Sequence, residues 1–173
     1  MIDPRHLFLV GFMGAGKSTV GRLVSAHMGR PFIDLDELVE RAARMPVTQI
    51  FAEKGEDAFR ALETEALRGL SSAEPAVVAC GGGVVLSPEN RALLKRLGRV
   101  VYLQVTAGEA LARIGDAGTR PLLAGPGGAL AATSLLSARE ALYRSVADST
   151  VETTGRTAEQ VANQITSTEG VAR

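Results

Sequence analysis

The sequence predicts an α/β fold in which a five-stranded parallel sheet carries helices on both faces. Short apolar runs of strand length alternate along the 173 residues with segments whose apolar residues recur every three or four positions. The second pattern is typical of amphipathic helices, and the alternation is typical of parallel strands joined by right-handed crossovers. Neither an internal repeat nor a low-complexity linker interrupts it, so residues 1–173 are expected to form a single domain.

Five apolar runs are the expected strands. They lie at Leu7–Val10, Pro31–Asp36, Ala76–Cys80, Val100–Val105 and Thr150–Thr153. The first and the third contain apolar residues only, which is typical of strands buried on both faces of a parallel sheet.

Capping residues mark several helix ends. Gly29 is expected to close the first helix, because glycine readily adopts the left-handed conformation found there. Ser87 followed by Pro88 predicts a helix start. Thr106-x-x-Glu109 and Thr157-x-x-Gln160 have the spacing of capping boxes.

Helical segments also fill the stretch between the second and third strands. The first is expected to stop at Pro46, and a short helical turn at Gln49–Glu53 leads to Gly55. An amphipathic helix is then expected from Glu56 to Leu70.

Residues 115–128 are rich in glycine and proline and lack apolar periodicity, so we expect a mobile lid loop there. A long helix should follow. Its apolar positions are Leu135, Leu136, Ala138, Leu142 and Val146.

Composition narrows the class of protein. The net charge is zero and the pI is about 6.7, which favours neither a nucleic-acid nor a membrane partner. One cysteine, Cys80, excludes an internal disulfide and a cysteine-rich metal site. No signal peptide or membrane-spanning run is recognisable. We therefore expect a soluble cytoplasmic protein, and we expect it to be a monomer.

The most informative motif begins where the first strand ends. Gly11-x-x-x-x-Gly16-Lys17-Ser18 lies between a strand and a helix, which is the context of a phosphate-binding loop. The glycines let successive N–H groups point at phosphate oxygens, and the helix N-terminus adds further donors. Lys17 supplies charge for the outer phosphates, and Ser18 offers a hydroxyl to Mg²⁺. The expected ligand is a nucleoside triphosphate.

Two further strands end in residues that are suited to a ligand-binding site. Asp34 and Asp36 end the second strand, and Gly81–Gly83 follow the third. Ligands bind beyond the carboxyl ends of parallel strands, so these residues should share a cleft with the phosphate-binding loop.

Asp34 and Asp36 allow two interpretations. On a strand, residues two apart face the same side, and two close carboxylates repel unless a cation or a donor separates them. Mg²⁺ could then bind one through water, and a substrate hydroxyl the other. Alternatively, the acids only favour the dipole of a helix that starts there.

Arg60 and the three glycines are also ambiguous. Arg60 has Glu56 and Glu63 at helical neighbour positions, so it is either a surface ion pair or a guanidinium that Glu63 orients toward a substrate carboxylate. Gly81–Gly83 would let a ligand approach the backbone closely, whereas a tight turn would explain only one or two of them.

Three further arginines could also contribute to the site. Arg120 lies on the expected lid and is either solvated or delivered to the transferring phosphoryl group; Arg113 and Arg139 are ambiguous by themselves.

No acid follows the third strand, so the carboxylate for Mg²⁺ must be Asp34. No guanine-recognition motif is present. The chain looks like a small-molecule kinase.

Taken together, the motifs resemble those of the shikimate kinase family, in order and spacing. They are Gly11–Ser18, Ile33-Asp34-Leu35-Asp36, Phe59-Arg60-x-x-Glu63, Gly81–Gly83, Arg120-Pro121-Leu122-Leu123 and Arg139-x-x-Leu142-Tyr143. The resemblance implies the nucleoside-monophosphate-kinase fold, a shikimate-binding region at about residues 34–63, and transfer of the γ-phosphoryl group of ATP to the 3-hydroxyl of shikimate.

The resemblance also implies roles for individual residues. Nucleotide contacts are expected from Gly14, Ala15, Gly16, Lys17, Ser18, Thr19, Arg113, Arg120 and Arg156. Shikimate contacts are expected from Asp36, Arg60, Gly81, Gly82, Gly83 and Arg139. Ser18 would bind Mg²⁺ directly and Asp34 through water, and the catalytic residues would be Lys17, Asp36 and Arg120.

Two rival functions remain open at this stage. A sister kinase of the same fold, such as a gluconate kinase, would not need Asp36, Arg60 and Arg139 together. A non-catalytic nucleotide-binding module would be expected to have lost Lys17, Asp34 or the lid arginine.

Overall fold

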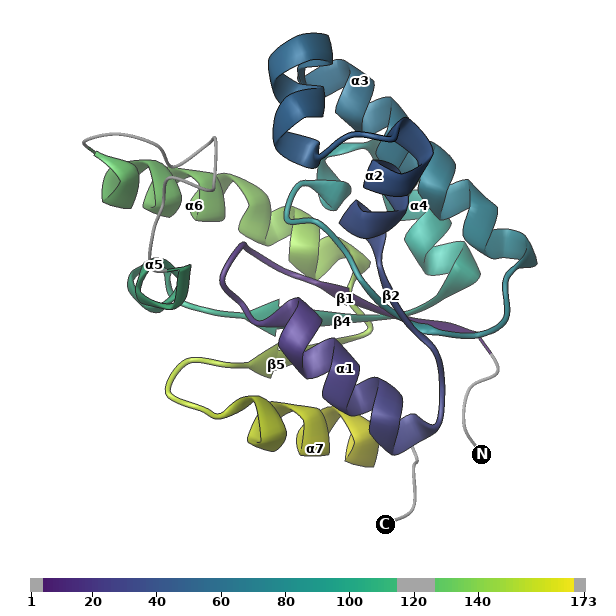
Figure 1. The fold of residues 1–173 in the computed structure, drawn as a ribbon. Coiled ribbons are helices and arrows are strands. Elements are labelled where there is room, and N and C mark those ends of the chain that lie inside the picture. Colours follow the sequence, from purple (N-terminus) through teal and green to yellow (C-terminus); the bar gives the residue numbers. More distant parts are fainter. Residues whose placement is uncertain (1–4, 115–126, 170–173) are drawn as a thin grey trace.

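The sheet confirms the predicted α/β class. The computed structural model describes residues 5–114 and 127–169, and in this part of the chain five strands pair in the order β2-β3-β1-β4-β5 (Figure 1). All pairings are parallel. The strands are β1 His6–Val10, β2 Phe32–Asp34, β3 Val77–Ala79, β4 Gly98–Gln104 and β5 Ser149–Glu152.

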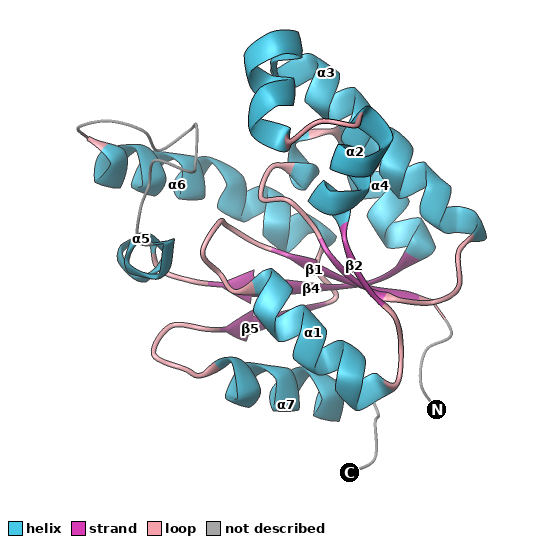
Figure 2. Ribbon diagram, viewed as in Figure 1, coloured by secondary structure: helices cyan, strands magenta, loops and turns pink. Residues whose placement is uncertain are grey.

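Helices cover both faces of the sheet, as predicted. Figure 2 shows α1 and α7 on one side and α3, α4 and α6 on the other. The helices are α1 Lys17–Met28, α2 Leu35–Ala43, α3 Val47–Gly69, α4 Pro88–Leu97, α5 Ala107–Ile114, α6 Gly128–Val146 and α7 Ala158–Thr168. Among the residues that the structure describes, 3-10 turns lie at Leu70–Ser72 and Val84–Leu86.

The central strand β1 divides the apolar core into two layers. Leu7 and Leu9 belong to the cluster that α1 and α7 cover, whereas Phe8 and Val10 belong to the cluster under α3, α4 and α6. Alternate residues of a strand point to opposite faces, so a run with apolar residues at every position is what a doubly covered strand requires.

Most predicted caps are confirmed. Gly29 ends α1 in the left-handed conformation, the Ser87 hydroxyl caps α4, and Thr157 with Gln160 forms a complete capping box on α7. The box at Thr106 is only half formed. Its hydroxyl accepts from the Glu109 N–H, but the Glu109 carboxylate accepts from the Gly155 N–H instead, because the turn after β5 lies against this helix end.

The break predicted inside the third helical region is confirmed. Gly55 has φ 83° and ψ 172° within α3, so this element consists of two helical segments joined at a kink. The preceding helix α2 ends at Ala43 and is closed by Arg44 in the left-handed conformation, slightly before the predicted stop at Pro46.

The prediction for the buried side of α6 is partly wrong. Ala138 is exposed, and the buried positions are Ala132, Arg139, Tyr143 and Val146. The apolar pattern passed over Arg139 because it is charged, yet its side chain is directed inward. The predicted lid at 115–128 extends slightly too far, since α6 begins at Gly128; residues 115–126 lie outside the described part.

Within the described residues, no helix combines the length and the apolar character that crossing a bilayer requires.

The capping box predicts a measurable contribution to stability. Replacing the Thr157 hydroxyl in Thr157→Ala leaves an N–H of the first turn of α7 without its acceptor, so the free energy of unfolding should fall by about 1 kcal/mol. Urea unfolding measures this. The control is Ser167→Ala, whose exposed hydroxyl donates within the same helix and should change stability by less than about 0.5 kcal/mol. Equal losses in the two variants would contradict the capping role.

Candidate active site

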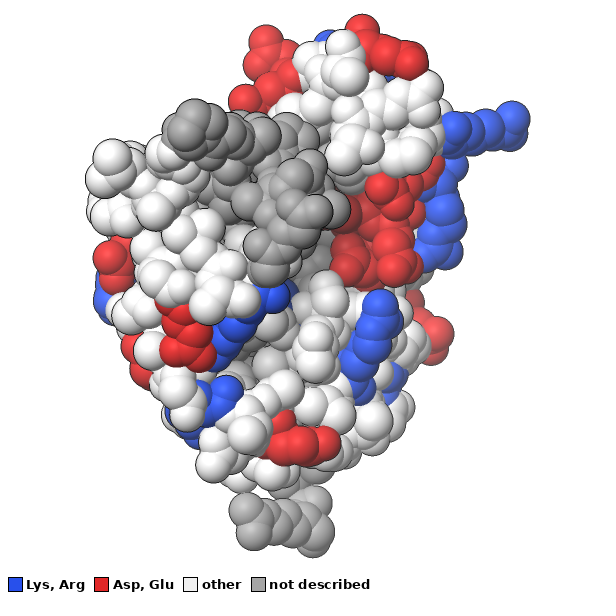
Figure 3. Space-filling view, turned by 60° about the vertical axis from the view of Figure 1, so that its left-hand side comes forward, with Lys and Arg blue, Asp and Glu red and all other residues white. Residues whose placement is uncertain are grey.

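The predicted cleft lies at the carboxyl ends of the strands. A cavity of about 340 Å³ is lined by the loop after β1 together with Asp34, Asp36 and residues after β3. Glu37 and Glu40 of α2 add to its rim, and acidic side chains gather beside the hollow in the space-filling view (Figure 3). The three strand ends that the sequence placed together do meet.

The loop after β1 has the backbone that its glycines predict. Gly11, Gly14 and Gly16 have φ of 149°, 78° and 88°, values that side chains rarely allow. A β-carbon on Gly14 would also lie 2.5 Å from the Ala110 carbonyl oxygen. Lys17 Nζ donates to the carbonyls of Gly11 and Phe12, each at 2.9 Å, so its ammonium group is held over the loop.

The local structure around Asp34 differs from the prediction. The strand β2 stops at Asp34 and α2 begins at Leu35, so the argument that residues two apart on a strand share a face does not apply. Asp34 is instead the N-cap of α2, and its Oδ1 accepts from the Asp36 N–H at 3.0 Å. The helix-start interpretation is therefore correct for the backbone, and both carboxyl groups nevertheless line the same cavity.

The residues expected to bind Mg²⁺ fit that ion. The Ser18 hydroxyl donates to Asp34 Oδ2 at 2.9 Å, which places two hard oxygen ligands where the phosphate-binding loop ends and α1 begins. Residues 5–114 and 127–169 contain no group of three or more His, Cys, Asp or Glu side chains that could hold a metal. An ion that keeps several waters and binds phosphates, as Mg²⁺ does, suits such a sparse site.

A second cavity of about 100 Å³ adjoins the first and shares Met13, Asp36, Gly81 and Gly82 with it. Its other lining residues are Val47, Phe51, Phe59, Arg60, Gly83 and Arg139. It therefore has apolar walls and two arginines, of which Arg139 is 5% exposed. Sequence patterns gave no signal for Met13, Val47 or Phe51.

Arg60 combines features of the two interpretations, since it forms ion pairs and also lines the cleft. Its Nη2 donates to Glu56 Oε1 and its Nη1 to Glu63 Oε2, each at 3.1 Å. Its side chain is only 17% exposed and lines the second cavity. The ion pairs thus orient the guanidinium toward the cleft.

Glu63 is wholly buried behind Arg60. Burial raises the pKa of its carboxyl from 4.5 to about 7, and the Arg60 guanidinium opposes that rise. Asn90 Nδ2 donates to Glu63 Oε2 at 3.4 Å, and Asn90 is itself fully buried on α4. The spacing Phe59-Arg60-x-x-Glu63 pointed to Glu63 only as a partner of Arg60, and no pattern pointed to Asn90.

The three glycines leave room for functional side chains. A β-carbon on Gly83 would overlap the Arg60 guanidinium, and one on Gly81 would lie 2.8 Å from Asp36 Oδ1. The Tyr143 hydroxyl donates to the Gly82 carbonyl from beneath the turn. None of the three has a positive φ, so close packing and not backbone conformation explains why glycine is needed here.

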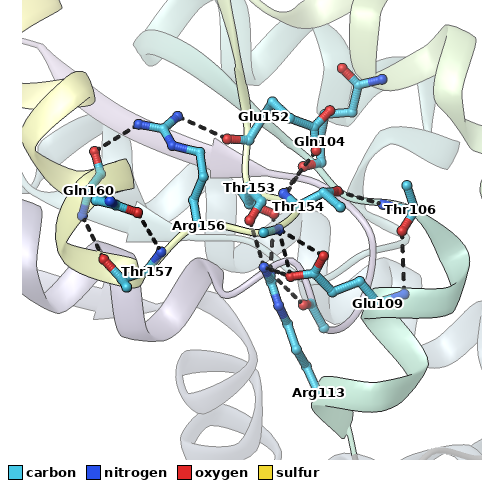
Figure 4. A network of polar contacts seen from close by, with 12 residues as sticks. Gln104, Thr106, Glu109, Arg113, Glu152, Thr153, Thr154, Arg156, Thr157 and Gln160 are labelled. Carbon is cyan, nitrogen blue, oxygen red and sulfur yellow. Dashed lines mark hydrogen bonds and ion pairs between the residues drawn. The ribbon is translucent and has the colours of Figure 1, made fainter.

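A third cavity, of about 340 Å³, extends the phosphate-binding loop toward α7. It is lined by Gly14, Ala15, Gly16, Thr19, Val20, Arg113, Thr153, Arg156, Ala158 and Val161. Figure 4 shows that Arg113 reaches the turn between β5 and α7, on which Arg156 itself lies. Arg113 donates to the Thr153 carbonyl at 2.7 Å, and Arg156 donates to the Glu152 carbonyl at 3.0 Å. Arg120, the remaining predicted site residue, lies outside the described part of the chain.

Comparison with known proteins decides the family. The shikimate kinase family model matches residues 13–169. The chain belongs to the shikimate kinase family. Membership makes this shikimate kinase homologue an ATP-dependent kinase that phosphorylates shikimate, a step of aromatic amino acid biosynthesis.

Individual relatives support the same family assignment. The shikimate kinase of Geobacter metallireducens is 43% identical over 162 residues, which cover 94% of this chain and 90% of the relative. The solved shikimate kinase from Acinetobacter baumannii, a complex with shikimate, is 40% identical with a TM-score of 0.89 and covers 93% of this chain and 90% of its own.

The sister-kinase alternative receives no such support. A gluconokinase from Sinorhizobium meliloti covers 98% of this chain and 93% of its own, with a TM-score of 0.56 and 18% identity. That likeness shows a shared fold alone.

The burial of Glu63 predicts a pH-dependent stability. Because its pKa is higher in the folded protein than in the unfolded chain, the stability that this group contributes is present below about pH 4.5 and is lost as the pH rises through about 7. The free energy of unfolding of the wild type, minus that of Glu63→Gln, should therefore decrease between about pH 5 and about pH 8. Urea unfolding of both proteins tests this, and a difference that is independent of pH would refute it.

Proposed function

We propose that MgATP binds in the phosphate-loop cavity, that shikimate binds in the adjoining cavity, and that the γ-phosphoryl group passes to the 3-hydroxyl of shikimate. The observation that carries this proposal is the wall common to the two cavities, formed by Met13, Asp36, Gly81 and Gly82. A ligand on each side of that wall would place an acceptor hydroxyl near the outer phosphate. Phosphoryl transfer needs such alignment and charge neutralisation more than covalent assistance.

On the nucleotide side, the N–H groups of residues 14–19 would hold the phosphates. Lys17 would exchange the carbonyls of Gly11 and Phe12 for phosphate oxygens. The third cavity, which Arg113 and Arg156 line, would receive the base. Ser18 would bind Mg²⁺ directly and Asp34 would hold one of its waters; the ion, when bound, neutralises phosphate charge.

On the acceptor side, Arg60 and Arg139 would bind the carboxylate of shikimate, because both residues line the small cavity. Asp36 would accept a hydrogen bond from the attacking hydroxyl and orient it. The turn at Gly81–Gly83 would supply backbone contacts. The role of Arg120 at the transferring phosphoryl group, and the mobile lid that would carry it, rest on the motif alone.

We further infer a monomeric, cytoplasmic protein without a nucleic-acid or membrane partner. A net charge of zero supports the absence of a nucleic-acid or membrane partner, because the protein has no strong positive electrostatic field to attract a polyanion. Light scattering of the purified protein tests the monomer.

The proposed acceptor is tested by ADP release from MgATP with shikimate, gluconate or nucleoside monophosphates. We expect stimulation by shikimate alone, and loss of that stimulation when EDTA removes Mg²⁺. Stimulation by a different acceptor would overturn the substrate assignment. Absence of stimulation by any acceptor, in protein that still binds ATP, would favour a non-catalytic binding module.

Asp36 is expected to act on turnover more than on nucleotide binding. Asp36→Asn removes the charge that orients the hydroxyl, so kcat should fall by about 100-fold or more, while the Kd for ATP should change little. The control is Glu37→Gln, the next residue on the cavity rim, whose carboxylate is exposed and paired with Arg22 and Arg41. Equal losses of kcat and ATP affinity in Asp36→Asn would exclude the role.

Gly83 is expected to be essential for the position of Arg60. The new methyl group in Gly83→Ala would displace the guanidinium, so the KM for shikimate should rise about tenfold or more, with the KM for ATP unchanged. Steady-state kinetics with each substrate varied separates the two constants. Gly108→Ala is the matched control, since a β-carbon there meets nothing within 4 Å. An unchanged KM for shikimate in Gly83→Ala would remove Arg60 from the acceptor site.

A further inference from the structure

Glu63 lies behind the acceptor cavity with its two carboxyl oxygens in different environments. Oε2 accepts from Arg60 Nη1 at 3.1 Å and from Asn90 Nδ2 at 3.4 Å. Oε1 is buried and has no hydrogen-bond partner among the residues that the structure describes. An ionised carboxylate with one unsatisfied, desolvated oxygen is costly, so the charged form of this group is only weakly favoured.

A second acid lies close to that unsatisfied oxygen. Glu63 Oε1 is 3.3 Å, and Asp36 Oδ1 is 2.8 Å, from the point where a β-carbon on Gly81 would stand. Of the other groups around Glu63, Arg60 and Arg139 are cations that lower its pKa. Cys80 stays a neutral thiol because burial raises its pKa well above the ordinary value, and α4 presents the uncharged Asn90. The two arginines offset the charges of Glu63 and Asp36, and Arg60 also pairs with Glu56, whose side chain is 46% exposed.

We propose that Glu63 takes up a proton from solvent when the carboxylate of shikimate binds to Arg60 and Arg139. This inference rests on the proposed function, because it requires the substrate carboxylate at these two arginines. The incoming anion shares the positive charge that stabilised ionised Glu63. A further negative charge nearby, together with loss of water from the cavity, shifts a buried carboxyl toward its neutral form. Binding and protonation are then coupled.

The contacts around Asn90 can serve either protonation state. With Glu63 ionised, Asn90 donates to it and accepts from the Thr64 hydroxyl at 2.7 Å. The same hydroxyl lies 3.0 Å from the Arg60 carbonyl, and it has one hydrogen to donate. A half-turn of the Asn90 amide would let Thr64 donate to that carbonyl and accept from Nδ2. Oδ1 would then accept from protonated Glu63. The amide rotation keeps Asn90, the Thr64 hydroxyl and Glu63 Oε2 paired in both states.

Proton uptake has a functional consequence. Neutral Glu63 no longer competes with the substrate for the charge of Arg60. Since the bound complex holds the extra proton, affinity for shikimate should be greatest between about pH 5, where the substrate carboxylate is still ionised, and about pH 7. It should fall by up to about tenfold per pH unit above pH 7, until Glu63 is ionised in the complex as well.

Calorimetry of the whole protein counts the protons directly. Shikimate is titrated into the enzyme at about pH 7.5 in phosphate, MOPS and Tris buffers, which differ in ionisation enthalpy. The slope of the observed binding enthalpy against that quantity gives the number of protons taken up. We expect roughly half a proton or more per shikimate bound. A slope of zero while shikimate binds overturns the inference.

Variants identify the group that takes up the proton. Glu63→Gln should abolish the uptake while still binding shikimate, because the amide keeps the shape of the carboxyl group. Glu56→Gln is the matched control; it removes the exposed partner of the same Arg60 and should leave the uptake in place. Undiminished uptake in Glu63→Gln would assign the proton elsewhere and overturn the inference. Failure of shikimate to bind the wild type at all would instead overturn the acceptor site itself.

The two histidines are not expected to account for the proton. His6 begins β1, at the end of the strand away from the phosphate-binding loop, and its ring bridges the Leu70 carbonyl and the Ala76 N–H. His27 lies in the last turn of α1, the end of that helix remote from Lys17. The dependence of shikimate KM on pH in His27→Asn should therefore match that of the wild type, whereas Glu63→Gln should flatten it.

Discussion

The central position of β1 is the constraint on which the rest of the structure depends. This strand pairs with β3 on one side and β4 on the other, and helices cover both of its faces, so every side chain from Leu7 to Val10 must be apolar. Its carboxyl end then opens in the middle of the sheet, where the neighbouring strand ends can reach it. The phosphate-binding loop, the N-cap of α2 and the glycine turn after β3 meet there because parallel strands end at one edge.

Local sequence rules were sufficient for the framework because most of its signals are short-range. Apolar runs, caps at Ser87 and Thr157, and the break at Gly55 depend on a few neighbouring residues, and the structure confirms them. Two predictions failed where tertiary contacts decide the outcome. Glu109 leaves its capping box to contact the turn after β5, and α6 buries a charged Arg139 in place of the small Ala138. Apolar periodicity cannot identify a buried arginine.

The functional site likewise contains residues that sequence motifs identify and residues that only tertiary contacts reveal. The spacing of the motifs identified Lys17, Ser18, Asp34, Asp36, Arg60 and Arg139, and the structure brings these residues to adjoining cavities. The reason for the glycine turn was not accessible from sequence, because Gly81 and Gly83 make room for Asp36 and Arg60, which come from other elements. Asn90 was missed for a similar reason. Its contact with Glu63 joins residues 27 positions apart, and a lone asparagine early in a helix carries no signature.

The lengths of the two outer strands have a consequence for the behaviour of the protein in concentrated solution. An open parallel sheet leaves unpaired N–H and C=O groups along its outermost strands, and a long apolar edge invites another chain to extend the sheet. Here β2 has 3 residues and β5 has 4, and each ends in an acid, Asp34 or Glu152. A strand from another molecule would gain few hydrogen bonds and would meet a negative charge. The apolar strands that hold the fold together are therefore kept from acting as templates for aggregation.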